Sequence, residues 1–187
     1  MHAGVIIFDS YEHFEKMTSR NRYKISGANN CVLLTVPLIK GRNQRIPMQE
    51  VLIYNEVNWQ LQHWRTLVSV YRSAPYFDHY EGSLKALFET PFTSLLDFSR
   101  AGINWVKQQL HIDFQEQASA TYIQQYGTNI KDLRKRTGKN GSTEAVKLPS
   151  YHQVFEERNG FIQDLSVLDM LFSEGPYTTE KLRLVII

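Results

Sequence analysis

A carboxylate and an imidazole stand next to each other near the N-terminus. Glu12 and His13 are adjacent, and either side chain could act as a base toward an amine or a hydroxyl group. Isolated histidines are more often surface or packing residues, so the pair alone is no catalytic signature. Catalysis would need a substrate-binding group close by.

A short basic stretch follows this pair and could supply that group. Arg20, Asn21 and Arg22 alternate like residues that enter a strand, which predicts both guanidinium groups on one side and the Asn21 amide on the other. Two forked donors on one face, with Lys16 close in sequence, suit a pyrophosphate. Alternatively, these arginines only pair with neighbouring carboxylates such as Glu12, as surface arginines commonly do.

Charge is distributed unevenly along the chain. The net charge at pH 7 is only +2, yet Lys16–Arg45 holds seven basic residues and no carboxylate, and Lys131–Lys147 holds six basic residues against two carboxylates. Such a separation can draw an anion to one face, with phosphate as the first candidate. Solvated edges of strands and loops are the alternative. We expect no nucleic-acid partner, because the net charge is small and no DNA- or RNA-binding module is recognisable.

Composition narrows the class of protein further. The chain has 187 residues, of which 42% are hydrophobic, enough to bury the core of one domain. With a single cysteine, Cys31, and six histidines that lack ligand spacing, we expect no disulfide, no metal and no cofactor. No apolar run reaches the roughly 18 residues of a membrane span, and the absence of a secretory leader predicts a cytoplasmic protein. Common nucleotide, hydrolase and zinc-protease motifs are also missing.

Hydrophobic periodicity predicts an α/β fold. Strands are expected at residues 5–8, 22–25, 31–39 and 51–53, and helices at 59–74, 82–88, 93–111 and 166–174. The second and third strands should form a hairpin across a turn at 27–30. We expect a small mixed β-sheet from the N-terminal third, packed against helices of the middle and C-terminal thirds. This gives a single domain over residues 1–187, with a mobile loop at about 137–147.

Three groups of residues follow a pattern known from other proteins. They are Glu12–Lys16 and Arg20–Arg22 at the front, Trp59, Trp64, Tyr71 and Pro75–Phe77 in the middle, and Pro149–Phe155, Gly160–Phe172 and Gly175–Pro176 near the C-terminus. In these groups the chain resembles the WbqC-like protein family, in the variety frequent in the Bacteroides group. Members usually begin with an extra strand and a Pro-Tyr-rich loop, and we expect that segment to be missing here.

The resemblance implies a role in surface-polysaccharide biosynthesis, such as that of O-antigen. The implied protein is an aminoacyl or acyl transferase that modifies a nucleotide-linked amino sugar, by glycyl or another aminoacyl transfer. The basic stretch would bind the nucleotide diphosphate, and Glu12 or Asp169 would remove a proton from the attacking amine. Tyr151 and Gln153 would contact the sugar. Asp169 has an alternative role, as the helix-capping partner of Ser166.

Two other functions stay open on the sequence. One is a non-catalytic binding or scaffolding protein for a sugar nucleotide or for a partner enzyme. The other is an inactive remnant, which the short front would explain. The acyl donor, the sugar and the oligomeric state are not predicted.

Overall fold

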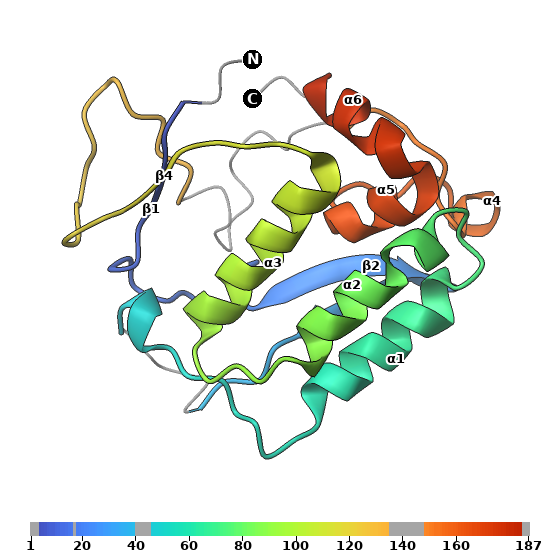
Figure 1. Cartoon of the computed structure of the whole chain (residues 1–187), viewed down its shortest axis with the longest axis horizontal. Helices are drawn as coiled ribbons and strands as arrows, with labels where there is room; N and C mark the ends of the chain where they lie inside the picture. Colours follow the sequence, from blue (N-terminus) through green and yellow to red (C-terminus); the bar gives the residue numbers. More distant parts are fainter. Residues whose placement is uncertain (1–3, 17, 40–45, 135–147, 185–187) are drawn as a thin grey trace. The chain divides into compact units, whose positions relative to one another are not determined.

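The α/β class is confirmed. The structure, a computed structural model, describes residues 4–16, 18–39, 46–134 and 148–184, as short strands and helices joined by loops (Figure 1). Two compact units are built from interleaved segments: unit 1 holds Met1–Asn21, Pro37–Asn55 and Phe92–Thr143, and unit 2 holds Arg22–Val36, Glu56–Pro91 and Glu144–Ile187. The single domain over 1–187 stays a prediction, and the loop expected at 137–147 lies outside the described residues.

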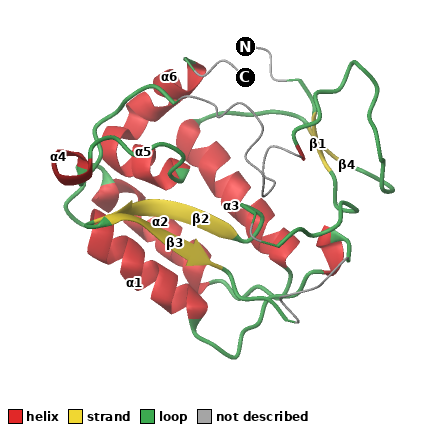
Figure 2. Cartoon of the chain, turned by 180° about the vertical axis from the view of Figure 1, so that it is seen from behind, coloured by secondary structure: helices red, strands yellow, loops and turns green. Residues whose placement is uncertain are grey.

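Unit 2 contains the predicted hairpin. Strand β2 (Arg22–Gly27) pairs antiparallel with β3 (Asn30–Thr35), with Gly27 opposite Asn30 at the turn (Figure 2). Asn30 has φ 97°, a conformation that tight turns require and that asparagine tolerates better than most residues. Strand β3 is shorter than predicted and ends two residues before Pro37, which has no N–H to donate to a ladder.

The helices of unit 2 bury faces of regular helical spacing. Helix α1 (Trp59–Tyr71), whose position the sequence predicted, buries Trp59, His63, Leu67 and Tyr71, one residue per turn. Helix α2 (Phe77–Glu89) begins just after Pro75 and is longer than predicted. The remaining elements are α4 (Glu156–Asn159), α5 (Val167–Glu174), η3 (Gly175–Tyr177) and α6 (Thr178–Arg183).

Phe172 of α5 is the centre of the aromatic core of unit 2. Its ring centroid lies 4.8 Å from that of Tyr71 and 5.1 Å from that of Phe77, and the Phe172 side chain is fully buried. Contacts between α1 and β2, and between α5 and β2, complete the core on the helical side of the hairpin. Aromatic pairs at these distances stabilise by more than their buried area alone.

Unit 1 is organised around a parallel strand pair and one long helix. Strand β1 (Ile6–Phe8), which the sequence predicted, pairs in parallel with β4 (Glu116–Ala118). Helix α3 (Leu95–Leu110) is capped by Ser94, whose hydroxyl accepts from the Asp97 N–H, and it packs on the short helix η1 (Met48–Glu50). The buried core residues of this unit are Phe14, Met48, Val51, Ile53, Leu95, Trp105 and Leu110.

The sheet differs from the expected one in its connections. Among the described residues the strands form two separate two-stranded sheets, and β4 comes from the second half of the chain. Its sequence, Glu-Gln-Ala, has no β-branched or aromatic residue and so gives no strand signal. Residues 51–53 form only isolated bridges, of Leu52 to Ser94 and of Ile53 to Leu38, in place of a strand.

Gly175, which ends α5, is a position where only glycine fits. Its φ is 56°, and an added Cβ would collide with the ring of Tyr76, whose own N–H is bonded to the Phe172 carbonyl oxygen. We expect Gly175→Ala to lower the free energy of unfolding by about 1–3 kcal/mol in urea denaturation. Gly82→Ala is the control, because its Cβ would meet open space within α2, and it should raise stability by about 0.5–1 kcal/mol. Equal stability of the two variants would contradict this account.

Candidate functional site

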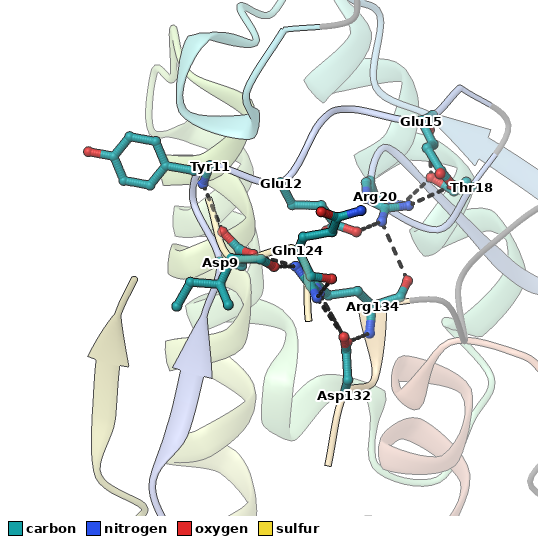
Figure 3. Close-up of polar contacts among 10 residues, drawn as sticks. Asp9, Tyr11, Glu12, Glu15, Thr18, Arg20, Gln124, Asp132 and Arg134 are labelled. Atoms are coloured by element: carbon teal, nitrogen blue, oxygen red, sulfur yellow. Dashed lines mark hydrogen bonds and ion pairs between the residues drawn. The ribbon is translucent and has the colours of Figure 1, made fainter. Parts of the chain in front are cut away.

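Two parallel strands of unit 1 end side by side, and the residues that follow them meet. Asp9 follows β1 and Ser119 follows β4. Because paired parallel strands have their carboxyl ends at the same edge, these two residues lie close together. The Asp9 carboxylate accepts from the Ser119 hydroxyl at 2.9 Å. It also accepts from the Tyr11 N–H at 3.1 Å (Figure 3). Only 4% of the Asp9 side chain is exposed, so its charge requires a cation nearby.

Arg134 provides that cation. Its Nη1 donates to Asp9 Oδ2 at 2.8 Å, and its Nε and Nη2 donate to the Asp132 carboxylate at 3.0 and 2.6 Å (Figure 3). The carbonyl oxygens of Ile123 and Gln124 accept further bonds, at 2.7 and 3.4 Å. The carboxylates on both sides raise the pKa of Arg134, and its side chain is 16% exposed. This guanidinium is therefore saturated by internal acceptors.

Arg20 forms a second ion pair in the same region. Its Nη2 donates to Glu12 Oε1 and, at 3.5 Å, to the carbonyl oxygen of Arg134, while its Nη1 lies 3.7 Å from Glu15 Oε2 (Figure 3). The loop is tied by the Thr18 hydroxyl, which donates to the Glu15 carbonyl oxygen at 2.7 Å. The Arg20 side chain is only 8% exposed, whereas that of Glu12 is 21% exposed.

The Glu12 carboxyl is the group of this region best suited to exchange protons. Burial raises the pKa of Glu12 above its ordinary value, and this effect exceeds the lowering by the hydrogen bond and charge of Arg20 and by the charge of Arg134. A partly exposed carboxyl whose pKa is shifted toward neutrality is the kind of group that enzymes use as a general base.

The ionised groups of this region form a cluster with more acids than bases. We call it the charge cluster; its members are Asp9, Glu12, Glu15, Arg20, Asp132 and Arg134. Four carboxylates face two guanidinium groups, so its formal charge is −2 when all are ionised. A cluster of this sign attracts a cationic group more readily than a phosphate.

Aromatic rings border the charge cluster. The Arg134 guanidinium lies 4.9 Å from the ring centroid of Tyr126 and 5.9 Å from that of Tyr122. The His13 ring lies 5.5 Å from the Tyr122 ring, and both His13 and Tyr122 are exposed. Of the predicted site residues, the structure thus brings together Glu12, His13 and Arg20.

The other residues of the basic stretch lie differently from the expected arrangement. Strand β2 begins at Arg22, so the alternation that predicts Arg20 and Arg22 on one face does not extend to Arg20 and Asn21. Asn21 is buried and ends the first segment of unit 1, whereas Arg22 belongs to unit 2 and is half-buried. Lys16 is exposed in unit 1.

Asp169 and Tyr151 meet in unit 2, inside the core. The fully buried Asp169 carboxylate accepts from the Tyr71 hydroxyl at 2.6 Å and from the Tyr151 hydroxyl at 2.9 Å, and the Ser26 N–H donates to the Tyr71 oxygen at 3.0 Å. Burial raises the pKa of Asp169, and the two tyrosine bonds oppose that rise. The Asp169 side chain thereby joins α5 to α1, while the cap of α5 is made by the Ser166 hydroxyl, which accepts from the Leu168 N–H.

Gln153 is also buried, and its amide is used inside unit 2. Its Nε2 donates to the Ile162 carbonyl oxygen at 2.9 Å, and its Oε1 accepts from the Ile162 N–H at 2.8 Å. The two bonds close the loop between residues 153 and 162 as a backbone pair would.

Sequence reasoning missed Asp9, Asp132 and Arg134 as members of a site. Asp9 had one available signal, since an acidic residue directly after a buried strand often lies at a functional edge of a sheet. Arg134 had none beyond its place in a basic stretch, because its partner Asp9 lies 125 residues away in sequence.

Two other kinds of site, a metal centre and a membrane span, are absent from the described residues. No group of three or more His, Cys, Asp or Glu side chains in the described ranges is placed to hold a metal ion. No helix in the same ranges has both the length and the apolar character needed to cross a bilayer.

The fold and the charge cluster define an α/β protein with a partly buried set of ion pairs, in which Glu12, Glu15 and Asp132 keep part of their side chains exposed. The model of the WbqC-like protein family matches residues 2–146, and the chain belongs to that family. The match spans all members of the charge cluster and ends before the C-terminal group at Pro149–Pro176. No curated protein and no solved structure matches the chain.

The hydroxyl of Tyr71 offers a direct test of the buried Asp169 network. Tyr71→Phe removes the hydroxyl that accepts from the Ser26 N–H and donates to Asp169, which should lower the free energy of unfolding by about 1–3 kcal/mol in urea denaturation. Tyr177→Phe is the control, since Tyr177 is 57% exposed, and it should change stability by less than about 0.5 kcal/mol.

The loss in Tyr71→Phe should also depend on pH. Because burial raises the pKa of Asp169, the folded protein binds the Asp169 proton more tightly than the unfolded chain does. The contribution of Asp169 to stability therefore falls as pH rises from the pKa of the unfolded chain to that of the folded protein. Removing the Tyr71 hydroxyl raises this pKa further. The deficit of the variant should therefore be largest at neutral pH and shrink as pH falls, and a deficit that grows on acidification would contradict the assignment.

Proposed function

We propose that the protein is a transferase that modifies a nucleotide-linked amino sugar in surface-polysaccharide biosynthesis, by glycyl or another aminoacyl transfer to the amine. Membership of the WbqC-like family supports the polysaccharide context. The observation on which the activity depends is the Glu12 carboxyl, which is partly exposed and whose pKa burial raises.

Glu12 is the proposed general base. The amine nitrogen of the sugar attacks the carbonyl carbon of an activated acyl donor, a C–N bond forms, and the bond from that carbon to the donor's leaving group breaks. The proton lost by the amine passes to Glu12, and Arg20 keeps the carboxylate in position. His13, exposed beside the same cluster, is a second proton carrier.

Of the other predicted residues, one is assigned to the nucleotide phosphates of the substrate and three to the core of unit 2. Lys16, exposed in unit 1, is the cation offered to the nucleotide phosphates, because Arg20 is already paired with Glu12. Asp169, Tyr151 and Gln153 use their polar atoms in internal bonds of unit 2 and are assigned no substrate contact.

A non-catalytic binding protein is the second candidate. The observation that favours it is that Arg20, Arg134 and Asp9 are all engaged in ion pairs, since networks of this kind also shift pKa values for purely structural reasons. Binding of a sugar nucleotide without any product would support this candidate over the transferase.

Turnover assays on the Glu12→Gln variant test the transferase. With nucleotide-linked amino sugars and activated glycine as substrates, we expect kcat to fall by about 10²–10⁴-fold, as for the loss of a general base. Glu12 must lose its proton before it can act as a base, and its pKa is raised. The kcat/KM of the wild type should therefore rise with pH above the range in which carboxylates usually titrate. The variant should lack this acid limb of the pH profile.

The control is Glu89→Gln, an exposed carboxylate at the end of α2, which should keep both kcat and the acid limb. An unchanged pH profile in Glu12→Gln would remove the proposed base. Absence of binding by every nucleotide sugar would remove the transferase and the binding protein together.

A further inference from the structure

Two buried donors, one in the charge cluster and one on a ring that borders it, have no hydrogen-bond acceptor among the described residues. They are Arg20 Nη1 and Tyr126 Oη, each with almost no exposed surface. The whole Arg20 side chain is 8% exposed, and the nearest carboxylate to its Nη1, that of Glu15, lies at 3.7 Å, beyond hydrogen-bond distance. Buried donors are nearly always bonded in native proteins, so each marks the place of an oxygen atom from water or from a ligand.

An acceptor is available next to these donors. Glu12 uses Oε1 for Arg20, while in the described residues its Oε2 accepts no hydrogen bond, and the side chain is partly exposed. Tyr126 lies beside the cluster, because the Arg134 guanidinium is 4.9 Å from the centroid of its ring. The ion-paired Arg20 and Glu12 therefore offer one donor and one acceptor, and the neighbouring Tyr126 hydroxyl can serve as either.

The charge of the cluster selects the sign of its ligand. Both guanidinium groups are paired with carboxylates, and the formal charge of −2 disfavours an added phosphate while it favours an ammonium. The ring of Tyr122, 48% exposed, adds an aromatic face of the kind that attracts cations and covers the apolar side of a sugar ring.

We propose that the charge cluster binds an amine and its neighbouring hydroxyl on an amino sugar, the amine at Glu12 Oε2 and the hydroxyl oxygen at Arg20 Nη1. This assignment rests on the proposed function, because it names the part of the substrate that the site holds. It also distinguishes the site from a phosphate-binding site. A ligand that donates to Glu12 Oε2 and accepts from Arg20 Nη1 satisfies both atoms without adding negative charge. Tyr126 completes the site as a second partner of the hydroxyl.

Isothermal titration of the full chain with four probes at neutral pH tests the assignment. We expect saturable binding of glucosamine, at least tenfold tighter than that of glucose or N-acetylglucosamine, because only glucosamine presents an ammonium next to a hydroxyl. Pyrophosphate should not compete with it. Three results would each overturn the proposal: no saturable glucosamine binding, equal affinity for N-acetylglucosamine, or displacement of glucosamine by pyrophosphate. In the first case, water alone occupies the site.

Two variants locate the binding. Glu12→Gln should weaken glucosamine at least tenfold and leave the weak binding of glucose unchanged, and Tyr126→Phe should weaken glucosamine severalfold. The matched controls are Glu89→Gln and Tyr54→Phe, whose side chains are exposed and outside the cluster. If Glu12→Gln fails to fold by circular dichroism, Tyr126→Phe alone decides, and unchanged affinity in it would place the ligand elsewhere.

The result is separable from the transferase activity. Turnover of a nucleotide-linked amino sugar that glucosamine does not inhibit would overturn this assignment and leave the proposed function standing. Glucosamine binding that depends on Glu12, without turnover of any substrate, would support the site and remove the transferase.

Discussion

The pairing of buried charges in unit 1 is the constraint on which the candidate site depends. Asp9 and Arg20 are each more than nine-tenths buried at the side chain, and a buried charge without a partner would cost several kcal/mol. Each therefore requires its counter-ion, Arg134 and Glu12, which brings the loop after β1 and the segment before residue 134 to one place. Because the partners come from loops, this pairing and the hydrogen bonds around it fix their geometry.

The same pairing gives Glu12 and Arg20 different roles in the proposed site. Arg20 is 8% exposed and is held by Glu12 and by the Arg134 carbonyl oxygen, whereas the Glu12 side chain is 21% exposed. An arginine in this setting orients a carboxylate and provides one further donor. It does not present a free fork to a diphosphate, and the site is better suited to an amine and a hydroxyl.

Local patterns in the sequence predicted the hairpin of unit 2, the helix at residues 59–71 and the helix that begins after Ser166. Each has a signal within a few residues: a turn, a helical stripe or a cap. The pairing of β1 with β4 and the contact of Asp9 with Arg134 have no such signal, because they join residues more than a hundred positions apart. The residue types of Glu12 and Arg20 predicted them as site residues. Phosphate binding was the expected role of Arg20, and its ion pair with Glu12 was the alternative, because the sequence does not show which side chains are buried.

The most direct test of this account is the pKa of Glu12 itself, followed by carboxyl ¹³C NMR in the free protein and with saturating glucosamine. In the free protein the pKa should lie above the ordinary glutamate value, because burial outweighs the attraction of the two arginines. A bound ammonium stabilises the carboxylate, so glucosamine should lower this pKa. An ordinary pKa that glucosamine leaves unchanged would contradict the account.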